Sequence, residues 1–253
     1  MFRRRAGGAA GAVSYLPAVA NPKIYIHELI EITGQNRARY MHHMTANWGP
    51  IGREERNLLC VGVWATVGST ERWPETVNLW EIEGWSGLAA NFRHEFSHPT
   101  LQDPALAKWW AEAASYRRGG HDRVLVPAPY APTLEEAMAQ GIGGEVYYHE
   151  LVSITPGRAR DYLAALEQEW LPVAGRVGLR LLGAYRTAMV NDSEAVVIWA
   201  IDTWETWAAA QEALDDDTEV ASWRERVHGL VIDWRGKLLV DSPLNPLKTG
   251  KIL

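Results

Sequence analysis

Two short segments of this sequence, KIYIHELIEI at 23–32 and EVYYHELVSI at 145–154, carry ionisable side chains among alternating apolar residues. The alternation predicts half-buried strands, in which successive side chains point to opposite faces. Glu28 and Glu150 then share a face with apolar residues, where an unpaired carboxylate has a raised pKa and can act as a general base. The structural alternative is a carboxylate held by an arginine, or by the N–H or O–H group of a neighbouring Trp or Tyr.

His27 and His149 precede these carboxylates and therefore point to the opposite face of the same strands, together with Tyr25 and Tyr147. If that face lines a barrel, two imidazoles and two phenols from equivalent strands could serve as acids, bases or hydrogen-bond donors. The alternative is that each histidine is a structural group with a satisfied hydrogen bond. The candidate catalytic residues are His27, Glu28, His149 and Glu150.

The sequence His94-Glu95-Phe96-Ser97-His98 has the HExxH spacing, which places two imidazoles one helical turn apart. On a helical wheel both histidines lie opposite the apolar stripe predicted to face a sheet. That stripe consists of Trp85, Leu88, Ala89, Phe92 and Phe96. Pro99 ends the helix directly afterwards, and no third ligand follows at a familiar spacing, whereas a catalytic zinc ion needs three protein ligands. The motif therefore does not predict a zinc protease.

Four histidines of the first half of the chain have no counterpart in the second half: His42, His43, His94 and His98. Residues that only one half carries are not required by a shared fold, and the ends of two neighbouring helices could bring these imidazoles together around a transition metal. A solvated, histidine-rich edge is the alternative. We expect no metal and no other cofactor, and these four side chains are the candidates if a metal is bound.

Tryptophan is unusually frequent, with 13 residues against three phenylalanines. Six tryptophans recur at equivalent positions of the two halves and are predicted to pack in the core: Trp48, Trp80, Trp85, Trp170, Trp199 and Trp204. Others could line an apolar ligand pocket with their indole donors, or form a subunit interface: Trp64, Trp73, Trp110, Trp207 and Trp234. The aromatic residues predicted to bind a substrate are Tyr25, Trp64, Trp80, Tyr147, Tyr185 and Trp199.

All these residues belong to an internal duplication. The stretch from Tyr25 to Pro50 aligns with that from Tyr147 to Pro172 at a separation of 122 residues, which falls to 121, 119 and 114 further along the chain. The separation changes between predicted elements, as expected of loop deletions. The predicted organisation is an N-terminal arm at 1–22, a first repeat at 23–133, a linker with a short helical piece at 134–144, a second repeat at 145–246 and a C-terminal tail at 247–253.

Each repeat has the pattern of a strand, an amphipathic helix, a strand hairpin, a helical segment and a closing strand. The order βαββαβ is that of the ferredoxin-like arrangement, an antiparallel sheet with helices on one face. The uncovered face of the sheet must also be buried, and two copies in one chain can bury it against each other. We therefore predict an α+β fold in which two tandem ferredoxin-like repeats form an intramolecular pseudo-dimeric α/β barrel.

The composition excludes several classes of protein. The chain has 253 residues, of which 47% are hydrophobic, and a net charge of −6, which argues against a nucleic-acid partner or an anionic membrane. No apolar run has the length of a membrane span. Cys60 is the only cysteine, so no intramolecular disulfide can form, and we expect a cytoplasmic protein with Cys60 as a buried small hydrophobe. Residues 1–22 resemble a targeting signal only superficially, because the segment is rich in glycine.

Three stretches carry a resemblance to a known family: HELVSITPGRARDYL, GAYRTAMVNDSEAVVIWAIDTWETWAAAQEAL and GVWATVGSTERWPETVNLWEIEGWSGLAANF. Together they resemble the NIPSNAP family of the dimeric α/β barrel superfamily. The chain departs from that pattern where an arginine usually follows Glu-Leu, because Ile30 and Val152 stand there. The resemblance implies the barrel fold, in a superfamily of cofactor-free monooxygenases, isomerases, cyclases, haem enzymes and binding proteins.

Two classes of function fit these observations. The first is an enzyme that binds an apolar or aromatic metabolite in a barrel pocket and performs isomerase, cyclase or monooxygenase chemistry without a cofactor. The second is a non-catalytic ligand-binding or assembly protein, in which the same residues are structural and tryptophans join subunits of a homo-oligomer. A metal enzyme that uses the histidines of the first half is a further alternative.

Overall fold

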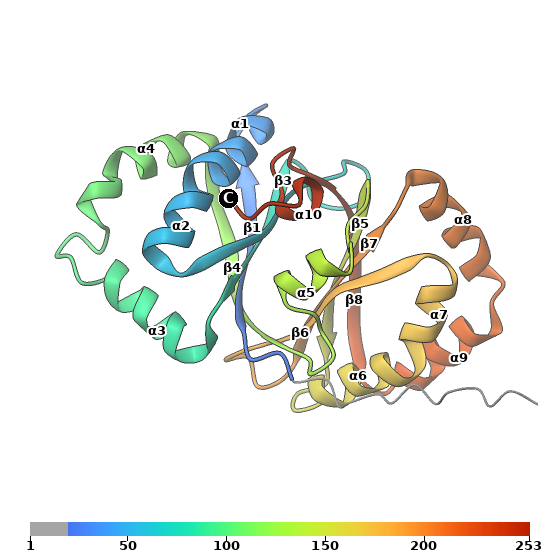
Figure 1. The fold of residues 1–253 in the computed structure, drawn as a ribbon. Coiled ribbons are helices and arrows are strands. Elements are labelled where there is room, and N and C mark those ends of the chain that lie inside the picture. Colours follow the sequence, from blue (N-terminus) through green and yellow to red (C-terminus); the bar gives the residue numbers. More distant parts are fainter. Residues whose placement is uncertain (1–19) are drawn as a thin grey trace, which may run out of the picture.

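The computed structural model describes residues 20–253, so residues 1–19 of the predicted N-terminal arm lie outside the described residues. Within that range, eight antiparallel strands form a closed barrel in the order β1-β3-β2-β8-β5-β7-β6-β4 (Figure 1). The strands are β1 (Ile24–Ile32), β2 (Leu58–Thr66), β3 (Glu75–Ile82), β4 (Arg117–Pro127), β5 (Val146–Ile154), β6 (Leu179–Thr187), β7 (Glu194–Ile201) and β8 (Val231–Asp241). The predicted fold of two βαββαβ repeats in one barrel is confirmed.

The helices cover the outside of the barrel in two groups, one from each repeat (Figure 1). The first group is α1 (Arg37–His42), a π-helical turn (His43–Trp48), α2 (Gly49–Arg56), α3 (Gly84–Glu95), a 3₁₀ turn (Pro104–Leu106) and α4 (Ala107–Tyr116). The second is α6 (Ala159–Ala165), a π-helical turn (Leu166–Trp170), α7 (Leu171–Arg176), α8 (Trp204–Asp215) and α9 (Thr218–Val227). Among the described residues, no helix is long and apolar enough to cross a membrane.

The two repeats meet at two equivalent seams of the barrel. β2 pairs with β8 at one seam and β4 pairs with β6 at the other, through corresponding residues of the two repeats. Because all neighbouring strands are antiparallel and β1 and β5 are four strands apart, these two strands run in the same direction on opposite walls. Side chains at equivalent positions of β1 and β5 therefore approach the barrel axis at the same height.

A glycine in each repeat makes room for an aromatic ring inside the barrel. The register of β2 shifts between Cys60 and Gly62, and that of β6 shifts next to Gly183. A Cβ at Gly62 would lie 2.1 Å from the ring of Trp64, and a Cβ at Gly183 would lie 2.1 Å from the hydroxyl oxygen of Tyr185. The two glycines therefore allow both rings to fold back over their own strands.

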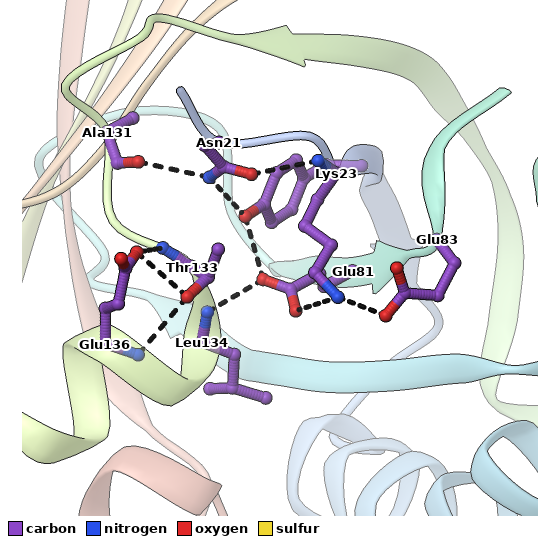
Figure 2. A network of polar contacts seen from close by, with 9 residues as sticks. Asn21, Lys23, Glu81, Glu83, Ala131, Thr133, Leu134 and Glu136 are labelled. Atoms are coloured by element: carbon purple, nitrogen blue, oxygen red, sulfur yellow. Dashed lines mark hydrogen bonds and ion pairs between the residues drawn. The ribbon is translucent and has the colours of Figure 1, made fainter. Parts of the chain in front are cut away.

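One end of the barrel is covered by the segment between the repeats. The predicted helical piece is α5 (Leu134–Ala139), which packs with Tyr25 and Tyr147 at the beginnings of β1 and β5. Figure 2 shows how its first turn is anchored: the backbone N–H of Leu134 donates to Glu81 Oε2 at 2.7 Å, and Thr133 and Glu136 form a capping box. The short C-terminal helix α10 (Pro246–Thr249) contacts α5.

The orientation of α3 differs from the predicted one. Leu88 and Asn91 are the buried residues of this helix, whereas Trp85, Phe92 and Phe96 are 52%, 39% and 53% exposed. Trp204, the counterpart of Trp85, is 37% exposed, so the prediction that this pair packs in the core is wrong. The cause is that α3 stands away from the sheet and leaves a cavity beneath it, which Phe92 and Phe96 line instead of filling.

Candidate functional site

The two histidines of the first and fifth strands meet on the barrel axis. His27 and His149 are 0% and 1% exposed, and their Nε2 atoms lie 2.9 Å apart. The face of the strands that carries the two histidines therefore lines the barrel, which is the condition stated above for their acting together. A distance of 2.9 Å between two ring nitrogens requires one of them to be protonated and the other to accept.

Burial, followed by the nearby cations Arg123 and Lys237, lowers the pKa of His27 well below its usual value. The pKa of His149 is lowered by burial, by His27 and by the same two cations. Both imidazoles are therefore neutral near pH 7, and a single N–H joins them. The Nδ1 atom of His27 is buried and has no hydrogen-bond partner among the described residues.

A buried ion pair lies at one seam of the barrel and a partly buried ion pair lies at the other. At one seam Lys237 of β8 pairs with Glu75 of β3, which also accepts a hydrogen bond from Thr66 of β2. At the other, the Nε of Arg123 on β4 donates to Glu194 Oε1 on β7 at 2.6 Å, and Thr187 of β6 donates to the same oxygen at 2.8 Å. Because each pair joins strands of different repeats, its first role is to hold the barrel closed.

A cavity of about 380 Å³ opens at the end of the barrel opposite α5. His149, Arg123 and Lys237 line its inner part. The arginines at its mouth are also paired, Arg72 with Glu31 and Arg235 with Asp233. The charges around this cavity are therefore largely balanced by each other.

The aromatic residues predicted to bind a substrate divide into two groups. Tyr25, Trp64, Tyr147 and Tyr185 are at most 1% exposed and lie in the packed interior cluster, away from the cavity at the barrel mouth. The Tyr25 and Tyr185 rings are 4.8 Å apart and those of Trp64 and Tyr147 are 5.4 Å apart. Trp80 and Trp199 point the other way, toward the helices, where their indoles bind the two glutamates.

Glu28 lies under the helices of the first repeat with one oxygen occupied. Its Oε2 accepts from Asn78 Nδ2 and from Trp80 Nε1, both at 2.8 Å. Its Oε1 accepts no hydrogen bond from the described residues. Burial raises the pKa of Glu28, and the neighbouring Asp122 raises it further. The hydrogen bond from a tryptophan, given above as the structural alternative, is present, and the pKa is raised as well.

The free side of Glu28 faces a cavity of about 340 Å³ between the sheet and the helices. Six aromatic side chains contribute to its lining: Trp48, Trp80, Phe92, Phe96, Trp109 and Trp110. Besides Glu28, its charged lining residues are Arg56, Glu95, Arg117, Asp122 and Arg123. Its polar lining includes Arg56 and Asn91, which are 5% and 8% exposed. Such a cavity has the size and composition of a site for a flat apolar molecule with a few polar groups.

Glu150 occupies the equivalent place in the second repeat, but both of its oxygens are occupied. Trp199 Nε1 donates to Oε2 at 2.7 Å and Trp234 Nε1 donates to Oε1 at 2.9 Å. Burial raises the pKa of Glu150 to about 7. A cavity of about 350 Å³ lies over it and is lined in part by Trp207 and Trp234, as predicted for a pocket with indole donors.

The four histidines of the first repeat do not gather into one group. His43 is buried and lies 4.7 Å from Trp109, ring to ring, whereas His42 is exposed. His94 and His98 approach Asp103, with Nε2 atoms 3.5 Å and 4.0 Å from its oxygens. Within residues 20–253, no group of three or more His, Cys, Asp or Glu side chains is placed to hold a metal ion. The convergence of these imidazoles around a metal, given above as an alternative, is therefore not present among the described residues. Cys60 is 3% exposed, as expected.

Sequence reasoning did not identify Asn78, Arg56, Arg123 and Lys237 as parts of these sites. A signal for two of them was present, because Arg123 and Lys237 are equivalent residues of the two repeats at a separation of 114. Cations at equivalent positions of two strands that line one barrel must lie near each other or find carboxylates. The repeat carries no such signal for Arg56, whose counterpart is Val177.

No protein-family model matches the chain, and no curated protein matches its sequence. Among solved structures, an anthrone oxidase-like protein is 14% identical, with 87% of this chain and 92% of that chain covered and a TM-score of 0.61. A candidate monooxygenase from Lactobacillus acidophilus is 11% identical, with 88% and 95% covered and a TM-score of 0.58. A NIPSNAP family protein of unknown function from Agrobacterium tumefaciens is 20% identical over 41% of this chain and 94% of its own, with a TM-score of 0.38. The first two proteins share the fold of the whole barrel.

Proposed function

We propose that this chain is an enzyme that binds an aromatic small molecule in the cavity of the first repeat and removes a proton from it with Glu28. The observation that carries the proposal is the carboxylate of Glu28, which has a raised pKa and a free Oε1 in a cavity with aromatic walls. Glu150 lacks the free oxygen, since both its oxygens accept indole N–H groups. The two repeats thus differ at the one atom that a general base needs.

The neighbours of Glu28 suit this role. Asn78 and Trp80 hold Oε2, so Oε1 keeps a fixed direction toward the cavity. A base in an apolar site is a stronger proton acceptor than the same carboxylate in water, because burial destabilises its charged form. The proton passes from a C–H or O–H bond of the substrate to Oε1, and the substrate keeps the electron pair. His27 and His149 lie on the other face of the sheet, so this step does not require them.

Loss of a proton is the first step of several cofactor-free reactions of aromatic compounds. Return of the proton to another atom completes an isomerisation, attack of the electron pair within the molecule closes a ring, and attack on dioxygen begins an oxygenation. The name of one structural neighbour, an anthrone oxidase-like protein, favours an aromatic substrate, and the name of another, a candidate monooxygenase, is that of one of these reactions. The reaction class within this group depends on the substrate.

An activated aromatic substrate, 5-nitrobenzisoxazole, tests the proposal directly. Removal of its ring proton breaks the N–O bond and releases a coloured cyanophenolate, so the reaction needs a base and no cofactor. We expect Glu28→Gln to lower kcat/KM by about 10²-fold or more, the usual contribution of a positioned general base. Glu150→Gln is the matched control and should keep the wild-type rate. Equal rates for the wild type and Glu28→Gln would refute the proposal.

The rate should also report the pKa of Glu28. Because only the carboxylate accepts a proton, kcat/KM should rise with pH, with a midpoint above the ordinary glutamate value of 4.5. The titratable groups around it are Asp122, Tyr40, Cys60 and Arg117, and Arg117 opposes the upward effect of Asp122. A midpoint at or below 4.5 would contradict a buried base.

A second function, assembly into a homo-oligomer, is favoured by the exposed apolar side chains beside the cavity. Phe92 and Phe96 on α3 and Met189 of the β6–β7 loop line the same cavity and are 39%, 53% and 85% exposed. Exposed apolar clusters mark contact surfaces more often than chance. Light scattering of the wild type and of a Phe92→Ser/Phe96→Ser variant tests this function. An oligomer that the double variant disperses supports it, and a monomeric wild type refutes it.

A further inference from the structure

Arg56 is a buried cation whose hydrogen-bonding capacity is largely unused. It is the last residue of α2 and is 5% exposed. Its Nη2 lies 3.5 Å from Asp103 Oδ2, and its Nε has no partner among the described residues. A guanidinium carries five N–H donors and stays charged at any ordinary pH, so a buried arginine is normally surrounded by acceptors.

Asp103 does not satisfy the donors of Arg56, because its carboxylate oxygens also interact with several other groups. Its Oδ1 accepts the backbone N–H of Ala105 at 2.9 Å and thereby starts the 3₁₀ turn before α4. His94 and His98 also approach its two oxygens. The hydrogen bond from Ala105, with smaller contributions from the two histidines and Arg56, lowers the pKa of Asp103. Its carboxylate is thus shared, and its contact with Arg56 is long for an ion pair.

Arg56 lines the same cavity as Glu28. The indole Nε1 of Trp109, another lining residue, is also buried without a partner among the described residues. Nη1 of Arg123 on β4, which also lines this cavity, is a third such donor, so three donors of different elements lack acceptors around one cavity. Buried donors without acceptors cost stability, which makes a missing acceptor the simplest explanation of all three.

The second repeat shows that the fold does not need this arginine. Asn57 and Gly178 are the left-handed residues that follow α2 and α7, with φ angles of 51° and 84°, and the residues before them are Arg56 and Val177. Arg56 is the last residue of α2, whereas Val177 is the residue after α7, which ends at Arg176. The position before the left-handed residue therefore carries a cation in one repeat and an aliphatic side chain in the other. The cavity over Glu150 does contain an arginine, Arg224, but that residue is exposed.

We infer that the ligand of the Glu28 cavity is an aromatic carboxylate and that Arg56 is the residue that selects its charge. The inference rests on the proposed function for the identity of the cavity, and adds the chemical class of the substrate. A carboxylate offers two oxygens in the plane of the guanidinium fork, so it can accept from Nε and Nη2 together. The aromatic part then lies among the tryptophan side chains, with the reacting C–H or O–H bond toward Glu28.

Two naphthalene compounds of the same shape test the inference without any reaction. Naphthalene-2-carboxylate carries the charge, naphthalene-2-carboxamide does not, and their Kd values are measured by calorimetry near neutral pH. We expect the wild type to bind the carboxylate at least about tenfold more tightly than the amide, the usual effect of a charged hydrogen bond. Arg56→Gln should remove this preference and leave the Kd of the amide within about twofold.

Arg53→Gln is the matched control, because Arg53 lies on the same helix but is exposed and paired with Glu54. It should keep the full preference. Should Arg56→Gln fail to fold, Asp103→Asn replaces it: the asparagine oxygen keeps the cap on Ala105, and loss of the competing charge should tighten carboxylate binding several-fold without changing the amide. An unchanged preference in Arg56→Gln or in Asp103→Asn, or no binding of either compound by the wild type, would overturn the inference.

The same variants separate this inference from the proposed function. Glu28→Gln should abolish the Glu28-dependent turnover of 5-nitrobenzisoxazole and keep the preference for the carboxylate. A protein with the Arg56-dependent preference but no Glu28-dependent turnover would refute the proposed function alone. A protein with that turnover and no charge preference would refute only the assignment of Arg56.

Discussion

Glu150→Gln should change the pH dependence of stability in a defined direction. Burial raises the pKa of Glu150 from its ordinary value of 4.5 to about 7, although the indole N–H groups of Trp199 and Trp234 counteract part of the rise. Between these two values the folded protein binds more protons than the unfolded chain, so its stability falls as the pH rises through this window. Above about 7 the full cost of the buried charge is present, whereas glutamine, which does not ionise, has no such cost.

The expected size follows from the two pKa values. Each pH unit between the folded and the unfolded pKa is worth about 1.4 kcal/mol, so ionisation of Glu150 should lower the free energy of unfolding by about 3 kcal/mol. The pH-independent effect of the substitution, in which one indole N–H loses its acceptor, is a constant offset. The prediction therefore concerns how the difference in free energy of unfolding between wild type and Glu150→Gln changes with pH.

Urea unfolding of the wild type and of Glu150→Gln, at a series of pH values from about 4.5 to 8.5, measures this change. Both proteins share all other titrating groups, including the buried histidines, so these contributions cancel in the difference. Glu145→Gln, at an exposed position just before β5, is the control. Its free energy of unfolding should change with pH in the same way as that of the wild type. The reasoning would be refuted if the difference in free energy of unfolding between the two proteins did not change with pH. It would also be refuted if the wild type became more stable relative to Glu150→Gln as the pH rises.

Three further predictions concern the barrel interior. Burial lowers the pKa of His27 and of His149, so the unfolded chain takes up protons first and wild-type stability should fall below about pH 6.5. Replacing both histidines with leucine should make this loss of stability at low pH smaller, as measured by urea unfolding. An equally steep loss in the double variant would contradict the prediction. Lys237→Met leaves Glu75 buried without its partner and should lower the free energy of unfolding by about 3–5 kcal/mol, measured by thermal unfolding. The double variant Lys237→Met/Glu75→Leu should recover most of this loss, because it removes the unpaired charge. Gly62→Ala places a Cβ 2.1 Å from the aromatic ring two residues on, and should cost about 1–3 kcal/mol of unfolding free energy, whereas an unchanged stability would show that the ring can move away.

The strands and their two faces could be predicted because the information is local. Period-two alternation in KIYIHELIEI separates Glu28 from His27 whatever the strand pairs with, and the duplication shows the pattern twice. The pattern left open which of the two faces lines the barrel, because the faces of a strand are distinguished by what packs against them. These predictions agree with the contacts of both residues.

The helical wheel misplaced α3 because hydrophobicity predicts which residues avoid water, not which element they pack against. Phe92 and Phe96 line a cavity and stay partly exposed, while Asn91 is buried beneath the same helix. A helix that packed tightly on the sheet would fill this space. For the histidines of the first repeat, the sequence left a metal site and a solvated edge open, and the structure places His43 against Trp109 of α4, apart from His94 and His98.

The sequence by itself determined that the chain is a duplicated βαββαβ unit, that Glu28 and Glu150 are buried among apolar residues, and that His27 and His149 lie on the other face, because each follows from periodicity within one strand or from identity between the halves. Only the tertiary structure decided that Glu150 has both oxygens occupied whereas Glu28 keeps one free, and that Arg56 lines the cavity of Glu28. Those properties depend on Trp234, Asn78 and the end of α2, which reach the glutamates from distant parts of the chain. The chemistry of a carboxylate depends on which donors reach it in space, and a single strand does not contain that information.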